Sequence, residues 1–561
     1  MVKEIAIKDQ TNVLPKKKLL ITFASLALGL LASFLDQNSL AVSLPDIGKD
    51  LHATNTTSWA GTSLLIANTT FQVLFGRLSD IFGRKVVLLG CMSILCLSQL
   101  ATCFCNTSTQ LYVFRGFAGI GNGGIQSLTM MIVSDVVTLE ERGKYQGILG
   151  TCVGLGNAVG PFIAAGFLKS VSWKGVYYFL CPLTALVTGV SMFVIPQSSE
   201  LKVNYENFKK IDFYGFGSSS TGIILFLVGL SGGGNVYAWN SPTVICLLTI
   251  GAVFLLLFLF TQWKLSRLPM MPLRLFSNIS VAIMLLQGLL FGLVYYSNVY
   301  FIPLYCELVR GMKPSIAACM SLPYLIIQAV VSTVCGALIS KYRSYGFFLY
   351  FGYTVWFLGT GLQIMFDQNL SIVGIIFILL CQGVGVGCIF QPTIVALQAH
   401  CRKPDRAVVI SIRNFMRSMG GSIGLAASSA ILSNVLSRKL RQADLSDLTQ
   451  AELNSLIKSV YSRPDLTKYS TSDQKAIRGA IAGSMRTVFI FFTPIMGVVW
   501  LMGFFIIDRG LQRPEDAAQQ KLEQEAKEAE KLVRVDSSEH SVRSKNESTA
   551  EAGGKDLVEE S

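Results

Sequence analysis

The stretch Gly76-Arg-Leu-Ser-Asp-Ile-Phe-Gly-Arg-Lys85 lies between two long apolar runs, roughly residues 58–75 and 86–105. It holds four charged side chains within ten residues, and charged side chains are costly to place in hydrocarbon. Each flanking run approaches the roughly 20 residues that a helix needs to cross a bilayer. We therefore predict a tight turn at a membrane surface, joining two membrane-spanning helices.

Two glycines and one acidic residue distinguish this turn from an ordinary loop. Gly76 and Gly83 are expected to let the backbone turn and to let the helices approach closely. Basic side chains surround Asp80 in sequence, namely Arg77, Arg84 and Lys85. Such a cluster can hold helix ends together in one conformation and release them in another. The stretch is therefore a candidate gating loop, and the alternative is a plain basic loop.

The composition is that of a membrane protein. Of the 561 residues, 51% are hydrophobic and 14% are charged, with a mean hydropathy of +0.51, which is too apolar for a soluble protein of this size. The net charge of +13 comes from short loops between apolar runs, a topology pattern that argues against nucleic acid as a partner. The 13 cysteines include no CxxC pair, and no catalytic motif such as HExxH occurs. We predict no metal, no cofactor and no enzymatic activity.

Apolar windows of about 20 residues predict fourteen spans. They lie near 19–44, 58–76, 86–105, 110–136, 145–168, 174–195, 213–232, 241–262, 279–303, 314–339, 346–366, 370–396, 407–435 and 487–508. Residues 1–18 form a polar tail that ends in three lysines, which indicates a cytosolic N-terminus. An even number of spans places the C-terminal tail in the cytosol as well, and basic residues then gather on the inner loops.

The chain shows weak internal symmetry. Gly336-Ala-Leu-Ile-Ser-Lys-Tyr-Arg echoes the Gly76 stretch, and Gly383-Val-Gly-Val-Gly echoes Gly119-Ile-Gly-Asn-Gly. Related helical halves are typical of secondary transporters, whose substrate site lies at the interface between the halves. We predict an N-terminal bundle at residues 19–195, an inserted helix pair with its linkers at 196–275 and a C-terminal bundle at 276–508. The C-terminal bundle contains a long outer loop at 436–486, and a cytosolic tail follows at 509–561.

Three sequons fall on predicted outer loops, at Asn55, Asn106 and Asn369. An Asn-x-Ser/Thr sequence accepts an N-glycan in a surface loop of a secreted or lumenal segment. Their placement supports the predicted topology and makes them candidate glycosylation sites.

Two ionisable residues inside spans are the candidates for proton coupling. Asp36 lies well along the first span, and a carboxylate in a low-dielectric environment generally holds a proton more tightly than in water. It can therefore load and release a proton as water access changes sides; the alternative is a hydrogen-bonded carboxylate that only holds helices together. Arg115 begins the fourth span and requires a partner there. It can tune a nearby proton site by its charge, or it can extend to the membrane interface.

The fifth span is rich in glycine between residues 150 and 166, and Gly156, Gly160 and Pro161 indicate close helix contact combined with bending. Polar side chains in other spans are candidates for lining a substrate path, and they are Gln126, Asn157, Gln391 and Arg417. The amides could equally be interhelical hydrogen-bonding groups, and the same alternatives hold for Gln287, Asn298 and Gln382.

These motifs resemble those of the major facilitator superfamily, and in particular its fungal fourteen-span drug:proton antiporters. The Gly76–Lys85 stretch is similar to the signature loop between helices two and three of the superfamily. Arg115 with two following glycines resembles the fourth-helix motif, whose arginine is linked to proton coupling. Residues 150–166 resemble the fifth-helix antiporter motif, and Leu35-Asp36 resembles the first-helix motif. That motif departs from the family pattern at Asn38-Ser39.

The resemblance implies a fold and a function. The implied fold is an all-α membrane protein with two six-helix bundles and two extra transmembrane helices. The implied function is proton-driven export of small organic compounds, such as drugs or toxins, through the plasma membrane or the vacuolar membrane. Vacuolar transporters of basic amino acids belong to the same branch and are one alternative. A membrane sensor that binds solute without moving it is an alternative of another class. The partners are a small molecule, protons and the lipid bilayer.

Overall fold

The computed structural model describes residues 14–53, 56–57, 59–138, 141–196, 211–233, 237–266, 268–402, 405–442, 471–508 and 510–511. The chain separates into two units, residues 1–511 and 512–561, and all described residues belong to the first. Within them the secondary structure is helical, without a β-strand, as the long apolar runs predict.

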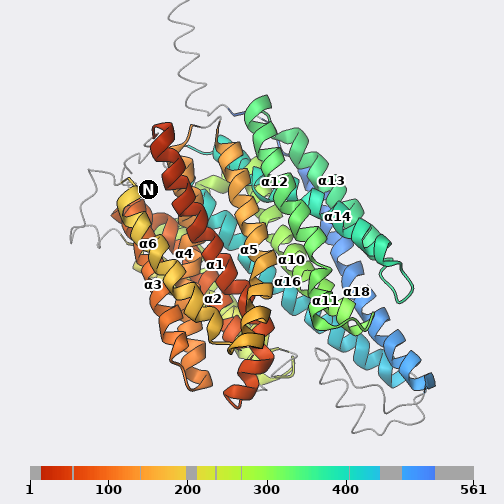
Figure 1. The fold of residues 1–561 in the computed structure, drawn as a ribbon. Coiled ribbons are helices and arrows are strands. Elements are labelled where there is room, and N and C mark those ends of the chain that lie inside the picture. The colour runs from red at the N-terminus through yellow and green to blue at the C-terminus, as the bar shows by residue number, and fades with distance from the viewer. Residues whose placement is uncertain are drawn as a thin grey trace, which may run out of the picture. The chain divides into compact units, whose positions relative to one another are not determined.

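Six long helices make up the described part of the first half (Figure 1). They are α1 (Lys16–Asp50), α2 (Trp59–Phe82), α3 (Arg84–Cys103), α4 (Ser108–Val136), α5 (Arg142–Ser170) and α6 (Gly175–Val194). α1 packs against α5 and α6, while α3 packs against α4 and α6. Local sequence sets some of the helix ends: the Thr107 side chain, for example, accepts a hydrogen bond from the Gln110 backbone nitrogen at the start of α4, an N-cap that satisfies a free amide.

The second half repeats this packing scheme. Its helices are α10 (Ile279–Leu308), α11 (Pro314–Cys319), α12 (Leu322–Tyr342), α13 (Gly346–Gln363), α14 (Ile372–Phe390), α15 (Pro392–His400), α16 (Arg406–Gln442) and α18 (Thr471–Gly503). α10 packs against α16 and α18, and α13 packs against α14 and α18. These are the contacts that α1 and α3 make in the first half, so the structure supports the predicted internal symmetry.

A helical pair lies between the halves in sequence. It consists of α8 (Phe213–Gly232) and α9 (Pro242–Phe260), which pack against each other and are followed by the short helices η1 (Thr261–Leu265) and η2 (Leu273–Ser277). α8 also packs against α2 and α16. The inserted pair therefore lies beside a contact between the two halves.

The halves meet through α2 against α16 and through α5 against α12, as the neighbouring α5 and α12 in Figure 1 show. Glycines permit both contacts. A Cβ atom at Gly76 of α2 would lie 2.6 Å from the Ser411 hydroxyl of α16, and one at Gly147 of α5 would lie 2.6 Å from the Ser332 carbonyl oxygen of α12. Small residues allow helices to approach this closely in a membrane.

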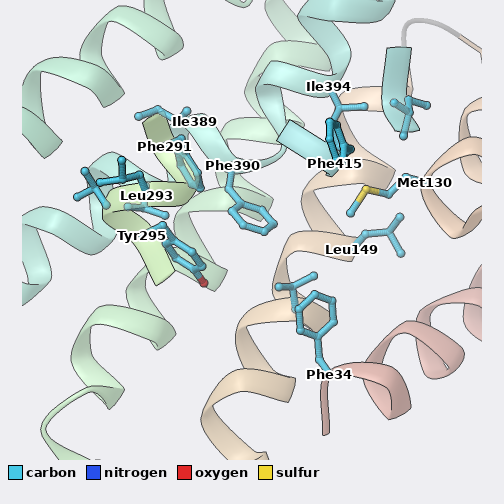
Figure 2. Close-up of a cluster of buried hydrophobic side chains, with 14 of the residues drawn as sticks. Phe34, Met130, Leu149, Phe291, Leu293, Tyr295, Ile389, Phe390, Ile394 and Phe415 are labelled. Carbon is cyan, nitrogen blue, oxygen red and sulfur yellow. The ribbon is translucent and has the colours of Figure 1, made fainter. Parts of the chain in front are cut away.

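Aromatic side chains from α10 and α14 form a buried cluster near this junction (Figure 2). The ring centroids of Phe291 and Tyr295 lie 5.8 and 5.7 Å from that of Phe390. Phe34 of α1 and Leu149 of α5 belong to the same buried core, which therefore includes side chains from both halves.

Eleven helices in the described part are long and apolar enough to cross a membrane by length and composition. Each of the fourteen predicted spans is mostly helical, but α2, α4 and α13 do not meet that criterion. The count of fourteen spans stays a prediction.

The predicted turn at Gly76 is wrong, and two predicted spans contain a helix break. α2 continues through Phe82, so Gly76 lies inside a helix and contacts α16, and the chain turns only at Gly83, whose φ is 93°. This left-handed conformation suits glycine because it has no Cβ. The predicted span 370–396 is divided at Gln391, because Pro392 cannot donate the backbone hydrogen bond of a continuous helix. The span 314–339 is likewise divided, after α11.

The predicted outer loop 436–486 contains helix at both of its ends. α16 extends to Gln442 and α18 begins at Thr471, so both helices occupy part of the predicted loop. Polar residues in these extensions lowered the local hydropathy without ending the helices. Residues 443–470 lie outside the described part of the chain.

Candidate functional site

Asp36 and Arg115 form an ion pair between α1 and α4. Both residues are 0% exposed, and the Arg115 Nη2 atom lies 3.0 and 2.9 Å from the two carboxylate oxygens of Asp36. The structure thus brings the two predicted coupling residues into contact. Because a buried ion needs a partner to offset lost hydration, each charge stabilises the other.

Three uncharged side chains complete this pair. Asn122 and Gln99 donate hydrogen bonds to the Asp36 carboxylate at 3.0 and 3.2 Å. Tyr177 accepts one from Arg115 Nη1 at 3.1 Å, and its ring centroid lies 5.1 Å from the guanidinium carbon. The charged form of the carboxylate therefore has several donors around it, and protonation of Asp36 would disturb all of these contacts.

Three of the four charged residues of the Gly76 stretch form a second cluster. Arg84 Nη1 lies 2.7 Å from the Asp80 carboxylate, and Arg77 Nη1 lies 3.5 Å from it. Arg84 also pairs with Asp135 at the end of α4, at 3.0 Å. Asp80 therefore has two of its three predicted partners, while no contact of Lys85 with Asp80 is observed among the described residues. The cluster joins the ends of α2, α3 and α4.

The glycines of α5 face two different helices. A Cβ atom at Gly156 would lie 2.5 Å from the Phe34 Cβ, and one at Gly160 would lie 3.1 Å from the Asn38 Cβ, both on α1. These contacts flank Asp36 in sequence. Pro161 follows directly within the same helix, which continues to Ser170.

Asn157 lies between these glycines and connects three helices. Its Oδ1 accepts a hydrogen bond from Asn38 of α1 at 2.8 Å, and its Nδ2 donates one to the Tyr295 hydroxyl of α10 at 3.1 Å. This predicted substrate-path residue thus links the first half to the aromatic cluster of the second half.

The break between α14 and α15 exposes a backbone acceptor to an arginine. The Ile394 amide bonds to the Gln391 carbonyl instead of continuing the α-helical pattern to Phe390. The Phe390 carbonyl is consequently available, and Arg413 of α16 donates to it. Irregular backbone of this kind occurs in membrane proteins where it is buried or lines a substrate site.

Arg417 lies one turn further along α16 and has no such partner. It is 0% exposed, and its Nε, Nη1 and Nη2 atoms have no hydrogen-bond partner among the described residues. Its guanidinium carbon lies 4.7 Å from the centroid of the Phe390 ring, which Figure 2 shows beside Tyr295. The site therefore presents a buried cation with unused donors.

Other unused polar atoms surround the break. Both amide atoms of Gln391 are buried without a partner in the described structure, and so is the hydroxyl of Tyr324, whose ring lies 6.1 Å from that of Tyr295. The Gln126 amide nitrogen on α4 is likewise unpartnered in the described part. Of the predicted substrate-path residues, Asn157, Gln391 and Arg417 lie around Phe390 and Tyr295, and no contact within the described ranges places Gln126 with them.

The remaining span amides have structural contacts. Asn298, Gln363 and Gln382 form a closed hydrogen-bonded triad, with three contacts of 3.0 Å between α10, α13 and α14. Gln287 donates to the Val499 carbonyl and accepts from Tyr353. These groups are satisfied within the protein, as expected of interhelical hydrogen bonds.

The sequons remain candidate sites. Asn106 and Asn369 are exposed in the turns after α3 and before α14, whereas Asn55 lies outside the described residues.

Several contact residues escaped the sequence reasoning. Asn122 is seven residues after Arg115, which places it on the same helix face two turns on, so helical periodicity could have revealed it. Asp135 could have been suspected as an acidic residue at the end of a span. Tyr295 and Phe390 carry no local sequence signal, because their place depends on how α10 and α14 pack.

The Major Facilitator Superfamily model matches residues 26–425. Citrate exporter 1 of Yarrowia lipolytica is 45% identical over 511 residues, covering 91% of this chain and 75% of that protein. The MFS-type transporter clz4 of Cochliobolus lunatus is 38% identical, covering 78% and 79%. Efflux pump dotC of Dothistroma septosporum (strain NZE10 / CBS 128990) is 31% identical, covering 85% and 82%.

Solved structures support the same fold. The proton:xylose symporter XylE has a TM-score of 0.58 at 12% identity, covering 90% of this chain and 99% of the solved chain. The human organic anion transporter MFSD10 has a TM-score of 0.54 at 12% identity, covering 87% and 100%. With the family match over most of its length, the chain belongs to the major facilitator superfamily and is a multi-pass membrane transporter.

Proposed function

We propose that this protein is a proton-coupled antiporter that exports small organic anions, with carboxylates as the preferred class. The observation that carries the proposal is Arg417, a fully buried guanidinium whose nitrogens have no hydrogen-bond partner among the described residues. An uncompensated buried charge is strongly destabilising. A substrate carboxylate would supply the missing partner, and a guanidinium can bind it through two parallel hydrogen bonds.

Positive charge at this site argues against cationic substrates. Arg413 lies one turn from Arg417 and contacts the same Phe390 ring, with its guanidinium carbon 5.5 Å from the ring centroid. A cationic drug or a basic amino acid would lie close to two positive charges here, and this repulsion would weaken its binding. The site chemistry thus supports an anion over the drug and basic amino acid expected from the motifs.

The relatives support the direction of transport. The 45% identical relative is named a citrate exporter and the 31% identical one an efflux pump. We infer export for this chain, with a di- or tricarboxylate of the size of citrate as the first substrate to test.

Proton coupling is assigned to Asp36 and Arg115. Protonation of Asp36 would remove the charge that Arg115 and Asn122 contact, and the helices α1 and α4 would lose part of their attraction. The cluster of Asp80, Arg84 and Asp135 would open and close one end of the substrate path. We place both termini in the cytosol and the protein in the plasma membrane or the vacuolar membrane.

The test is transport by the purified protein in liposomes with an acidic lumen. Labelled citrate, lysine and a cationic drug are offered separately, with and without an uncoupler. We expect citrate to accumulate, the uncoupler to abolish accumulation, and Arg417→Gln to prevent it. Accumulation of lysine or the drug without citrate would overturn the anion assignment, and flux of none of them would favour a solute sensor.

A further inference from the structure

Three consecutive residues of α1 contact different neighbouring helices. Successive residues of an α-helix point about 100° apart. Asp36 faces α3 and α4 through Gln99 and Arg115. The next two residues, Gln37 and Asn38, each begin a hydrogen-bond chain that crosses to the second half of the protein.

The first chain runs through α5. Asn38 donates to Asn157 at 2.8 Å, and Asn157 donates to the Tyr295 hydroxyl of α10 at 3.1 Å. Tyr295 belongs to the aromatic cluster with Phe390, whose ring also faces Arg417.

The second chain runs through α2. Asn68 donates to the Gln37 side-chain oxygen at 3.4 Å, and Gln72 donates to the Asn68 oxygen at 2.8 Å. Ser418 of α16 then donates to the Gln72 oxygen at 3.1 Å. The second chain therefore ends at the residue next to Arg417 on α16, and the first ends at the aromatic cluster whose Phe390 ring lies against Arg417.

We propose that these two chains couple the protonation of Asp36 to anion binding at Arg417. This inference rests on the proposed function and adds its coupling elements, for which Asn157 and Gln72 are the central positioning residues. The amide side chains pass on a movement of α1 through their hydrogen bonds, and the proton does not have to travel along them. A shift of α1 on protonation changes the geometry of both chains, and the chains then move the α10 and α16 segments that hold Tyr295 and Ser418.

Reciprocal coupling gives the proposal a measurable form. If protonation of Asp36 changes anion affinity by some factor, anion binding must change proton affinity by the same factor. Coupling of this kind typically amounts to about 5- to 150-fold. We expect wild-type affinity for citrate to differ by about ten-fold between mildly acidic and mildly alkaline pH. Titration of citrate itself is common to all variants and cancels in comparisons between them.

The experiment compares Gln72→Leu/Asn157→Leu with the wild type, as full chains in lipid nanodiscs. Leucine keeps a similar volume and removes the hydrogen bonds. Thr151→Val is the matched control, because Thr151 also crosses from α5 to the second half, where it contacts Thr333 and the Ala329 carbonyl, but belongs to neither chain. Asp36→Asn serves as the reference without a titrating group.

Citrate binding is measured at both pH values. We expect the double variant still to bind citrate, with the pH effect on its affinity reduced to less than about two-fold. Thr151→Val should keep the full pH effect. A full pH effect in the double variant would overturn the proposal, and so would loss of citrate binding at both pH values, because the amides would then be substrate ligands.

A second readout does not need the substrate. Spin labels at the exposed Phe104 and Val373 report the distance between the two halves. We expect acidification to shift this distance in the wild type and in Thr151→Val. The distance should not change in Asp36→Asn or in the double variant. A shift that persists in the double variant overturns the coupling role. If the shift is lost in the double variant as expected but no protein, including the wild type, binds citrate, only citrate as the substrate is rejected.

Discussion

At the scale of single residues, two buried arginines have opposite roles and predict opposite effects on stability. Arg115 is paired with Asp36, whereas Arg417 has no hydrogen-bond partner in the described structure. Arg115→Gln leaves a buried carboxylate unpaired, which should cost about 3–5 kcal/mol in unfolding free energy. Arg417→Gln removes an uncompensated charge, so the melting temperature should stay equal or rise. Thermal unfolding of both variants in the same detergent measures the difference.

Arg417→Gln should at the same time weaken citrate binding by about ten- to hundred-fold, because hydrogen bonds to charged groups contribute about 1.5–3 kcal/mol. Stability that rises while affinity falls is typical of a site that retains strain for function. A clear drop in the melting temperature of Arg417→Gln would show that the residue has a structural partner and would contradict its assignment to the substrate.

The Asp36–Arg115 pair makes a second residue-scale prediction. Asp36→Asn and Arg115→Gln break the same buried ion pair, so their effects on the free energy of unfolding should not add. The double variant should be about as stable as the less stable single variant, or more stable. Purely additive losses in a double-mutant cycle would contradict the direct pairing seen at 2.9 Å.

Sequence reasoning identified three charged members of the candidate site, but not Arg413 or the uncharged surroundings. Asp36, Arg115 and Arg417 stood out because each is a charge within an apolar span. Contact between Asp36 and Arg115 could not be derived from spacing, since the two are 79 positions apart. Tyr295 and Phe390 look like ordinary core aromatics until the packing of α10 and α14 is known.

At the scale of helices, the glycines of α5 should differ sharply in how well they tolerate substitution by alanine. A methyl group at Gly156 would meet the Phe34 Cβ at 2.5 Å, whereas one at Gly166 meets nothing within 4 Å. We expect Gly156→Ala to destabilise by about 1–3 kcal/mol through overpacking. Gly166→Ala should be neutral or stabilising by up to about 1 kcal/mol, because alanine favours helix. Equal effects in denaturation would contradict the close contact of α5 with α1.

Helix positions were predictable where the apolar runs were long, and helix ends were not. Polar residues hid the continuation of α16 to Gln442 and the start of α18 at Thr471. Gly76 appeared to be a turn residue because glycine has both uses, turning and close packing. Only tertiary contact with Ser411 of α16 distinguishes them. Pro392 did carry a sequence signal for the break before α15.

At the scale of the whole molecule, the proposed transport requires the two halves to move relative to each other. Thr151 and Thr333 lie in contact across α5 and α12. In a variant without the 13 native cysteines, Thr151→Cys and Thr333→Cys should form a cross-link between the halves. We expect oxidation to stop transport and reduction to restore it, since a fixed interface prevents alternating access.

The matched control links two helices of one half. Cys335 of α12 and Cys388 of α14 have sulfur atoms 3.3 Å apart. A protein that retains only these two cysteines should transport after oxidation nearly as well as before. Full transport by the protein linked between α5 and α12 would exclude rigid motion of the halves about that contact.

The two-half architecture was predictable from repeated glycine motifs and from the spacing of apolar runs. How the halves meet was not predictable, because α5 contacts α1 with one set of glycines and α12 with another. Both sets show the same small-residue pattern in sequence. The proposed substrate site at this junction therefore depends on the three-dimensional arrangement, whereas membership in the superfamily could be inferred from the sequence.

Proton movement driven by a carboxylate gradient tests the central claim most directly. The purified protein is placed in liposomes that contain a pH-sensitive dye, and citrate is added outside at mildly alkaline pH. We predict that citrate entry drives protons outward and raises the lumenal pH in the wild type, with no change in Asp36→Asn or Arg417→Gln. Citrate entry without a change in lumenal pH, or an unchanged response in Arg417→Gln, would contradict proton-coupled anion transport at this site.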